Sequence, residues 1–60
     1  MKNRLFCVVV IWRDGDTEDA DEFRLFAPTA TTAKAMGARR WKEKNLRWKH
    51  CKVVGVVVNP

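Results

Sequence analysis

The 60-residue chain contains no serine and only one histidine, His50. The absence of serine excludes a serine nucleophile, and the histidine has no carboxylate near it in the sequence to form a catalytic pair. Cys51 follows His50 directly, but neighbouring residues of a strand point to opposite faces and could not act together. The three glycines stand far apart, which excludes a glycine-rich phosphate loop. We therefore expect no catalytic residues, no cofactor and no enzymatic activity.

Cysteine is almost as scarce, with Cys7 and Cys51 alone. Disulfide-stapled secreted domains carry more cysteines at closer spacing, and neither a CxxC nor an HxxxH motif offers metal ligands. We expect two small buried thiols in a reducing cytoplasm, although strands that placed them opposite each other could bridge them. No apolar run approaches the about 20 residues that a membrane span needs. The sequence predicts one cytoplasmic domain over residues 1–60, without a metal site or a membrane contact.

Apolar runs are what the chain has in excess. Residues 5–12 are apolar at every position, and residues 53–58 are apolar apart from one glycine. Because both runs are rich in β-branched residues, they predict two strands. Residues 22–26 alternate apolar and charged side chains and predict an edge strand with one solvated face. The acidic stretch before them begins at Asp14-Gly15, which is typical of a hairpin turn, and predicts a solvated loop.

The next segment predicts a helix over residues 30–45. Thr29 can cap its N-terminus, and Asn45 suits the left-handed position at its end. Small residues and Trp41 recur on one side at helical spacing, and Gly37 among them costs the helix about 1 kcal/mol relative to alanine. This cost predicts that the helix lies close to the sheet at Gly37 and that Trp41 belongs to the core. The stretch between this helix and the last strand alternates and is expected to be extended.

The predicted element order is β-β-α-β, an α+β fold in which a three-stranded antiparallel sheet of order 2-1-3 carries one helix on one face. The other face has no cover. Six or seven apolar side chains left there at about 1.5 kcal/mol each would cost about 10 kcal/mol, which rivals the ~5–15 kcal/mol stability of a whole domain. We therefore expect a homo-oligomer, with a dimer as the first guess, or else a sheet that rests on a different protein. Which face the helix covers stays open, and the residues expected at the interface are Leu5, Cys7, Val9, Ile11, Val54, Val56 and Val58.

Charge is unevenly distributed along the chain. Residues 1–27 carry a net charge of −2, whereas residues 28–60 hold eight basic residues and one acidic residue, a net charge of +7. Cations attract phosphate groups, and tryptophans interleaved with them can stack on bases. Cations at the end of a helix also offset its negative dipole end, so the pattern has a purely structural alternative. The residues expected to contact nucleic acid or another polyanion are Arg39, Arg40, Lys44, Arg47, Trp48 and Lys49.

The succession of an apolar strand, a DG turn, the phrase EFRLFAPTATTAKAMGARRW and a closing valine strand resembles a loose class of short phage-encoded accessory proteins. The resemblance implies the β-β-α-β layout and a non-enzymatic role in host takeover or anti-defence, and it assigns no functional residues. The leading hypothesis is a small oligomeric module that binds nucleic acid or another polyanion. The alternatives are an inhibitor that docks on a host protein through the acidic hairpin or a sheet edge, and a protein that sequesters a small nucleotide.

Overall fold

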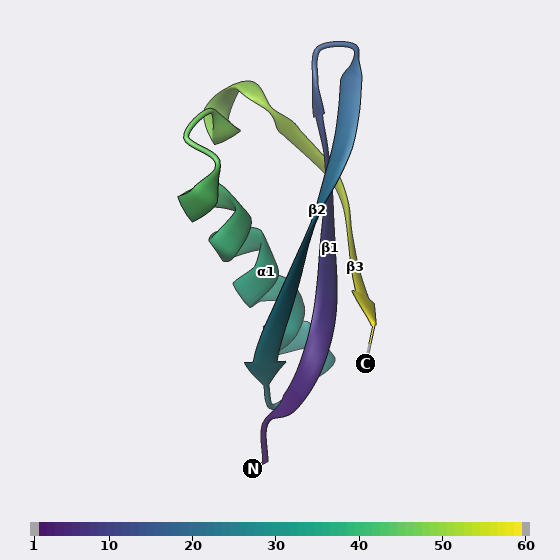
Figure 1. The fold of residues 1–60 in the computed structure, drawn as a ribbon, viewed down its shortest axis with the longest axis vertical. Coiled ribbons are helices and arrows are strands. Elements are labelled where there is room, and N and C mark those ends of the chain that lie inside the picture. The colour runs from purple at the N-terminus through teal and green to yellow at the C-terminus, as the bar shows by residue number, and fades with distance from the viewer. Residues whose placement is uncertain (1, 60) are drawn as a thin grey trace.

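Three strands form one sheet, and a single helix lies against one of its faces. A computed structural model describes residues 2–59. Its elements are β1 (Arg4–Asp14), β2 (Thr17–Ala27), α1 (Ala30–Lys44), the short 3₁₀ helix η1 (Trp48–His50) and β3 (Lys52–Asn59). The strand order is β2-β1-β3 with both pairs antiparallel, and Figure 1 shows α1 on one side of this sheet. The predicted α+β fold and its 2-1-3 order are confirmed.

The hairpin of β1 and β2 is longer than predicted. The strands pair from Arg4 opposite Ala27 to Asp14 opposite Thr17. Gly15 has a φ of 63° while no other residue in the described chain has a positive φ, and a positive φ at only the first turn residue is typical of a type II′ hairpin. The hairpin prediction at Asp14-Gly15 is confirmed, but the acidic stretch after it is strand and not loop. The tight turn fixes the register, so Glu18, Asp19, Asp21 and Glu22 each lie opposite a residue of β1, and Asp16 stays in the turn.

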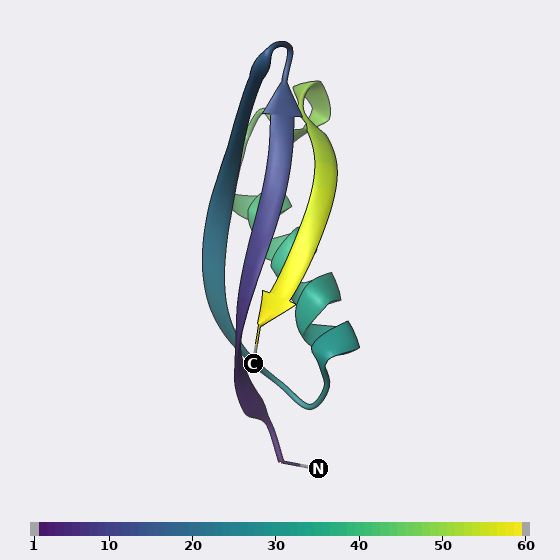
Figure 2. The same ribbon diagram turned by 90° about the vertical axis from the view of Figure 1, so that its right-hand side faces the viewer.

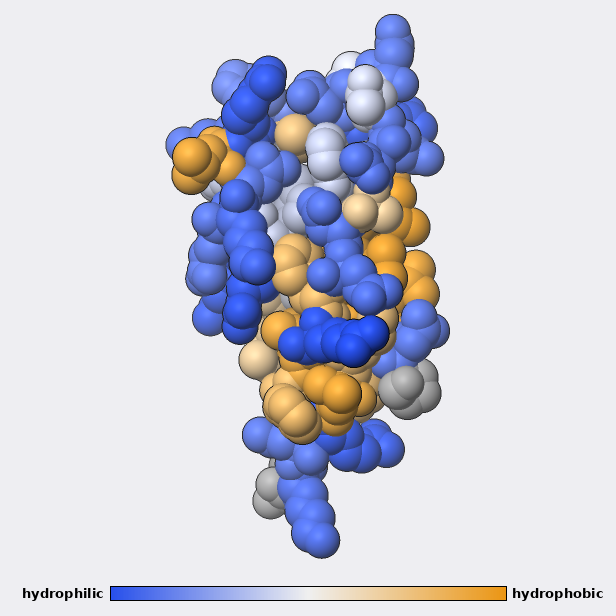
Figure 3. Space-filling model, viewed as in Figure 1, coloured by the Kyte–Doolittle hydropathy of each residue, from blue (hydrophilic) through white to orange (hydrophobic). Residues whose placement is uncertain are grey.

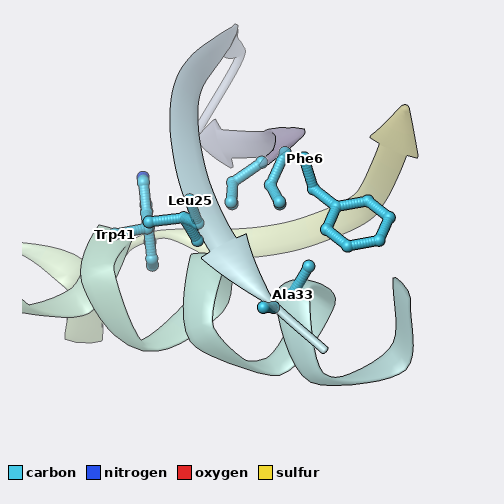
Figure 4. Close-up of a cluster of buried hydrophobic side chains, with 7 residues drawn as sticks. Phe6, Leu25, Ala33 and Trp41 are labelled. Carbon is cyan, nitrogen blue, oxygen red and sulfur yellow. The ribbon is translucent and has the colours of Figure 1, made fainter. Parts of the chain in front are cut away.

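The core lies between α1 and the sheet. Phe6, Val8 and Val10 of β1 face the helix and are at most 3% exposed. Figure 4 shows Leu25 beside Trp41 and Phe6 above the part of α1 that carries Ala33. A Cβ added to the buried Gly37 would overlap the Val8 side chain. The predicted close approach at this glycine and the placement of Trp41 in the core are both confirmed.

The two ends of α1 differ in how well the sequence predicted them. Thr29 is the N-cap, and its Oγ1 accepts a hydrogen bond from the Thr32 backbone N–H at 3.2 Å. Asn45 ends the helix in an extended conformation, with φ −105°, and not in the predicted left-handed one. Its Oδ1 accepts a hydrogen bond from the Arg47 N–H at 3.1 Å. This side-chain turn leads into η1, so the link to β3 is a 3₁₀ turn and not the extended segment that was predicted.

The register of β3 corrects part of the predicted interface. Val56 pairs with Val10 and Val58 pairs with Val8, so both face α1 and pack against the core. They were expected on the uncovered face. Val57 takes that place instead, opposite Val9. A bulge between Ile11 and Trp12 shifts the register of β3, which a run of valines that reads alike in either register could not reveal.

The sheet face opposite α1 is uncovered by residues 2–59, and Figure 2 looks onto this face with α1 behind the strands. Leu5 is 49% exposed, Phe26 opposite it is 64% exposed, and Val57 is 46% exposed. In Figure 3 apolar side chains gather along the right-hand side, away from the helix. We call this surface the open face. It carries four of the remaining predicted interface residues, which are Leu5, Cys7, Val9 and Ile11, whereas Val54 is exposed at the bulge and has no partner on β1.

Within residues 2–59, no helix combines the length and the apolar character that crossing a membrane requires.

Candidate functional site

The basic residues of the second half of the chain lie on α1, on η1 and around them. All eight, from Lys34 to Lys52, are exposed. Arg39, Arg40 and Lys44 belong to the C-terminal half of α1, and Arg47 and Lys49 to the turn that follows. The Asn45 turn leads into η1, where Lys49 and Lys42 of the helix both lie near the Trp48 ring. We call the surface of Arg39, Arg40, Lys42, Lys44, Arg47 and Lys49 the basic surface.

The acidic hairpin does not neutralise the basic surface. Among residues 2–59, Arg47 is the only one of these cations with a carboxylate oxygen within 4.0 Å, and its distance to Asp14 Oδ2 is 3.9 Å. The other ion pair, Arg13 to Glu18 at 3.1 Å, is internal to the hairpin. An exposed pair at 3.9 Å contributes little. The positive charge of this segment is therefore left for solvent ions or a ligand.

Trp48 takes a different position from the one predicted. It was expected to contact a polyanion from the surface, but it is half-buried and packs against the core. Lys42 Nζ lies 5.0 Å and Lys49 Nζ 5.8 Å from its ring centroid. Cations at these distances are attracted by the ring. Trp48 therefore holds two ammonium groups of the basic surface near each other, a role that depends on the η1 turn.

A pocket of about 700 Å³ opens next to the basic surface. It lies between β2, the end of α1 and the turn that follows. Three aromatic residues line it: Trp12, Phe23 and Trp41. The ring centroids of Trp12 and Trp41 are 6.2 Å apart and the rings are tilted by 42°. Trp41 is 1% exposed, whereas Trp12 and Phe23 are half-buried, so those two side chains present aromatic surface to the pocket.

Of the two indole N–H groups at the pocket, one has a hydrogen-bond acceptor in the described part of the chain and the other has none. The Trp12 indole Nε1 donates a hydrogen bond to Asp21 Oδ2 at 2.9 Å. The Trp41 Nε1 is buried and has no acceptor among residues 2–59. A buried donor without an acceptor costs about 1–3 kcal/mol. Lys44 places its Nζ 5.7 Å from the Phe23 ring centroid, and Arg47 lies at the rim.

The sequence-based prediction found two of the residues that line this pocket, Lys44 and Arg47, and missed its aromatic and acidic lining. Arg39, Arg40, Trp48 and Lys49 lie outside it. One signal was available, because Asp21 continues the inward-facing series of Phe23 and Leu25. Burying a carboxylate costs free energy unless it accepts hydrogen bonds, so an acid at an inward position of an apolar series predicts a hydrogen-bond donor nearby. Nothing in the sequence joined this residue to the turn after α1.

The two cysteines form no disulfide with each other. Cys7 pairs with Asn59 at one end of β3, while Cys51 precedes Lys52, which pairs with Arg13. Six strand positions separate them along β1, about 20 Å. A hydrogen bond to the Glu22 side chain, together with burial, raises the pKa of the Cys7 thiol. A thiol held protonated is a poor nucleophile.

Comparison of the chain with protein-family models, with curated proteins and with solved structures finds no match. The resemblance to short phage-encoded proteins therefore stays a prediction, and the site has to be interpreted from its own chemistry.

Proposed function

We propose that the protein is a non-enzymatic, self-associating module that binds nucleic acid through the basic surface. The observation that carries the proposal is that its six cations are exposed and that only Arg47 has a carboxylate, at 3.9 Å, within residues 2–59. A phosphate backbone would supply the missing anions. Binding would release the counterions condensed on that backbone, so the affinity would fall steeply as salt is added.

The salt dependence of binding tests this proposal. A labelled single-stranded oligonucleotide is titrated with the protein at ~50 and ~200 mM salt, and fluorescence anisotropy reports the bound fraction. We expect Arg40→Gln and Lys49→Gln each to weaken binding and to reduce the salt slope by about 1. Arg13→Gln is the matched control, because it removes the same charge from a residue already paired with Glu18. Absence of binding by the wild-type protein at ~50 mM salt would overturn the proposal.

Self-association through the open face is the second part of the proposal, with a second copy of the chain as the occupant. The exposed Leu5 and Phe26 need a cover, since contiguous apolar patches on a monomer are usually binding sites. Glu22 and Arg24 flank a shallow pocket of about 320 Å³ on this face together with Leu5 and Cys7. A two-fold axis between Glu22 and Arg24 would place Glu22 of each copy against Arg24 of the other copy. This self-complementary charge favours a second copy over an unrelated protein.

Docking on a host protein is a second candidate, favoured by the hairpin tip. The tip extends away from α1 in Figure 1, and its carboxylates Asp16, Glu18 and Asp19 are exposed. An inhibitor would present these acids to a basic partner. Capture of one stoichiometric protein from a host lysate, unchanged by nuclease treatment and lost in Asp19→Asn, would select this function over nucleic-acid binding.

A further inference from the structure

We infer that the pocket of Trp12, Phe23 and Trp41 binds a single unstacked nucleobase, with guanine preferred. The inference rests on the proposed nucleic-acid binding, because the neighbouring basic surface would take the phosphates. The same chemistry could reach the pocket as a base of a single strand or as a free nucleotide. The pocket volume of about 700 Å³ lies within the ~300–1,000 Å³ that is common for sites of small ligands.

The aromatic residues favour a flat ligand. Trp12 and Phe23 are half-buried and present aromatic surface to the pocket. Aromatic surfaces of this kind stack on nucleobases with little regard to sequence. The contact between Trp12 and Trp41, with centroids 6.2 Å apart, leaves no space between these two rings. A base would therefore lie against the exposed parts of Trp12 and Phe23, and Trp41 would form the floor.

Leu46 supports a ligand at this position. It lines the pocket and is 92% exposed. A leucine with so few contacts gains nothing from the fold of its own chain, whereas a ring in the pocket would cover it. Its neighbours in the turn, Asn45 and Arg47, also line the pocket, so this short segment provides both apolar and polar contacts.

The polar groups select a base over an aliphatic or fully apolar ring. The Oδ2 of Asp21 accepts the hydrogen bond from the Trp12 indole, and no donor to its Oδ1 is found among residues 2–59. Asp21 is half-buried, so this oxygen is free to accept an N–H from a ligand that covers it. The Trp41 N–H is buried without an acceptor, and a ligand that reached the floor could supply one. A ligand without polar groups would leave both unsatisfied.

Guanine meets these requirements best. Its N1–H and N2–H₂ groups are adjacent donors from which a carboxylate oxygen can accept, and its O6 and N7 are acceptors on the adjoining edge. A thymine would turn carbonyl oxygens toward the carboxylate on both sides of its one N–H. Lys44 and Arg47 at the rim are placed to take the phosphate of the same nucleotide.

Two short oligonucleotides test the inference: an oligothymidine, and the same strand with one central guanine. We expect the guanine strand to bind the wild-type protein about tenfold more tightly at ~50 mM salt. Asp21→Asn should remove this preference and keep the affinity for oligothymidine, because an asparagine Oδ1 still accepts from Trp12. Leu46→Ser, at a residue that packs on little, should reduce the preference several-fold without lowering the melting temperature. Asp16→Asn is the matched control, since it removes the same charge from the hairpin turn, and it should change neither affinity.

A second arm uses guanosine monophosphate and thymidine monophosphate, with tryptophan fluorescence as the readout. We expect the guanine nucleotide alone to change the fluorescence. Equal binding of both oligonucleotides with no response to guanosine monophosphate overturns the pocket inference and leaves the proposed function standing. A fluorescence response without binding to either oligonucleotide supports a free-nucleotide pocket and overturns the proposed function. A guanine preference that survives Asp21→Asn contradicts the role given to this carboxylate.

Discussion

On the face of the sheet that α1 covers, Val8 and Val10 are fully buried. On the opposite face Val9 and Ile11 are half-buried, although they belong to the same strand and are equally apolar. Phe26 at the edge of this face is 64% exposed, whereas Phe6 on the covered face is 3% exposed. The difference follows from having one helix for two apolar faces. The covered face explains how the chain folds, and the open face explains why we expect it to associate.

The largest expected effect compares two adjacent valines of β3. Val56→Asp places a carboxylate against the core and should cost on the order of 3 kcal/mol, a large part of the total stability of a small domain. Val57→Asp places the same charge on the open face, so it should leave the subunit folded and remove self-association. The measurement is the melting temperature by circular dichroism over a range of protein concentrations.

If the two variants behave alike, the proposed difference between the covered face and the open face is wrong. Val56→Asp should lower the melting temperature at every concentration. Val57→Asp should remove the dependence of the melting temperature on concentration, because a dimer is stabilised by mass action and a monomer is not. Equal destabilisation by both would mean that the register of β3 differs from the pairing of Val56 with Val10.

A smaller effect is expected at Gly37, where α1 comes closest to the sheet. Gly37→Ala adds a Cβ that would overlap Val8, and overpacking of this kind should cost about 1–3 kcal/mol, more than the roughly 1 kcal/mol that alanine gains in a helix. Gly55→Ala is the matched control, since its Cβ would lie 3.9 Å from Ile11 Cδ1, an ordinary contact. Urea unfolding measures both. A stabilised Gly37→Ala would contradict the close approach, whereas rescue by Val8→Ala would confirm it.

The covered face was the more predictable of the two. The apolar run of β1, the Thr29 cap and the cost of Gly37 each have a local cause that the sequence displays. The choice of Val57 over Val56 for the open face depends on a bulge, which arises from the pairing of strands distant in sequence. The pocket depends on the turn after α1. In this turn the Asn45 side chain accepts a hydrogen bond from the Arg47 N–H, which favours a turn over the extended conformation that the sequence pattern predicted. Local signals therefore predicted the elements but not the junctions between them.

A third prediction follows from the proposed dimer and concerns the charged residues of the open face. Arg24→Glu alone should weaken self-association about tenfold or more, because it would set like charges opposite each other across the two-fold axis. Glu22→Arg should do the same. The double variant restores opposite charges and should recover the association of the wild-type protein, which light scattering and sedimentation measure.

The double variant separates charge pairing from any other effect of the substitutions. Recovery requires that Glu22 of one copy meets Arg24 of the other, which no monomer contact would produce. A wild-type protein that stays monomeric in dilute solution contradicts the proposed dimer outright. A dimer that both single variants leave intact would mean that the two sheets meet in another register.

The smallest effect concerns Cys7, which lies on the open face beside Glu22. The hydrogen bond to this side chain and burial raise the thiol pKa, so the thiol stays protonated to higher pH than a free cysteine, and any stability this contributes is lost only as the pH rises through the raised pKa. The rate of alkylation, followed by peptide mass spectrometry, should therefore rise with pH along a curve displaced to higher pH. Glu22→Gln should move that curve back, whereas Glu18→Gln, at the hairpin, should not. Because burial in a dimer would both slow alkylation and raise the thiol pKa further, all variants are compared at one dilute protein concentration, so that the position of the curve reports on the carboxylate. A curve unchanged by Glu22→Gln would show that Glu22 does not control this thiol.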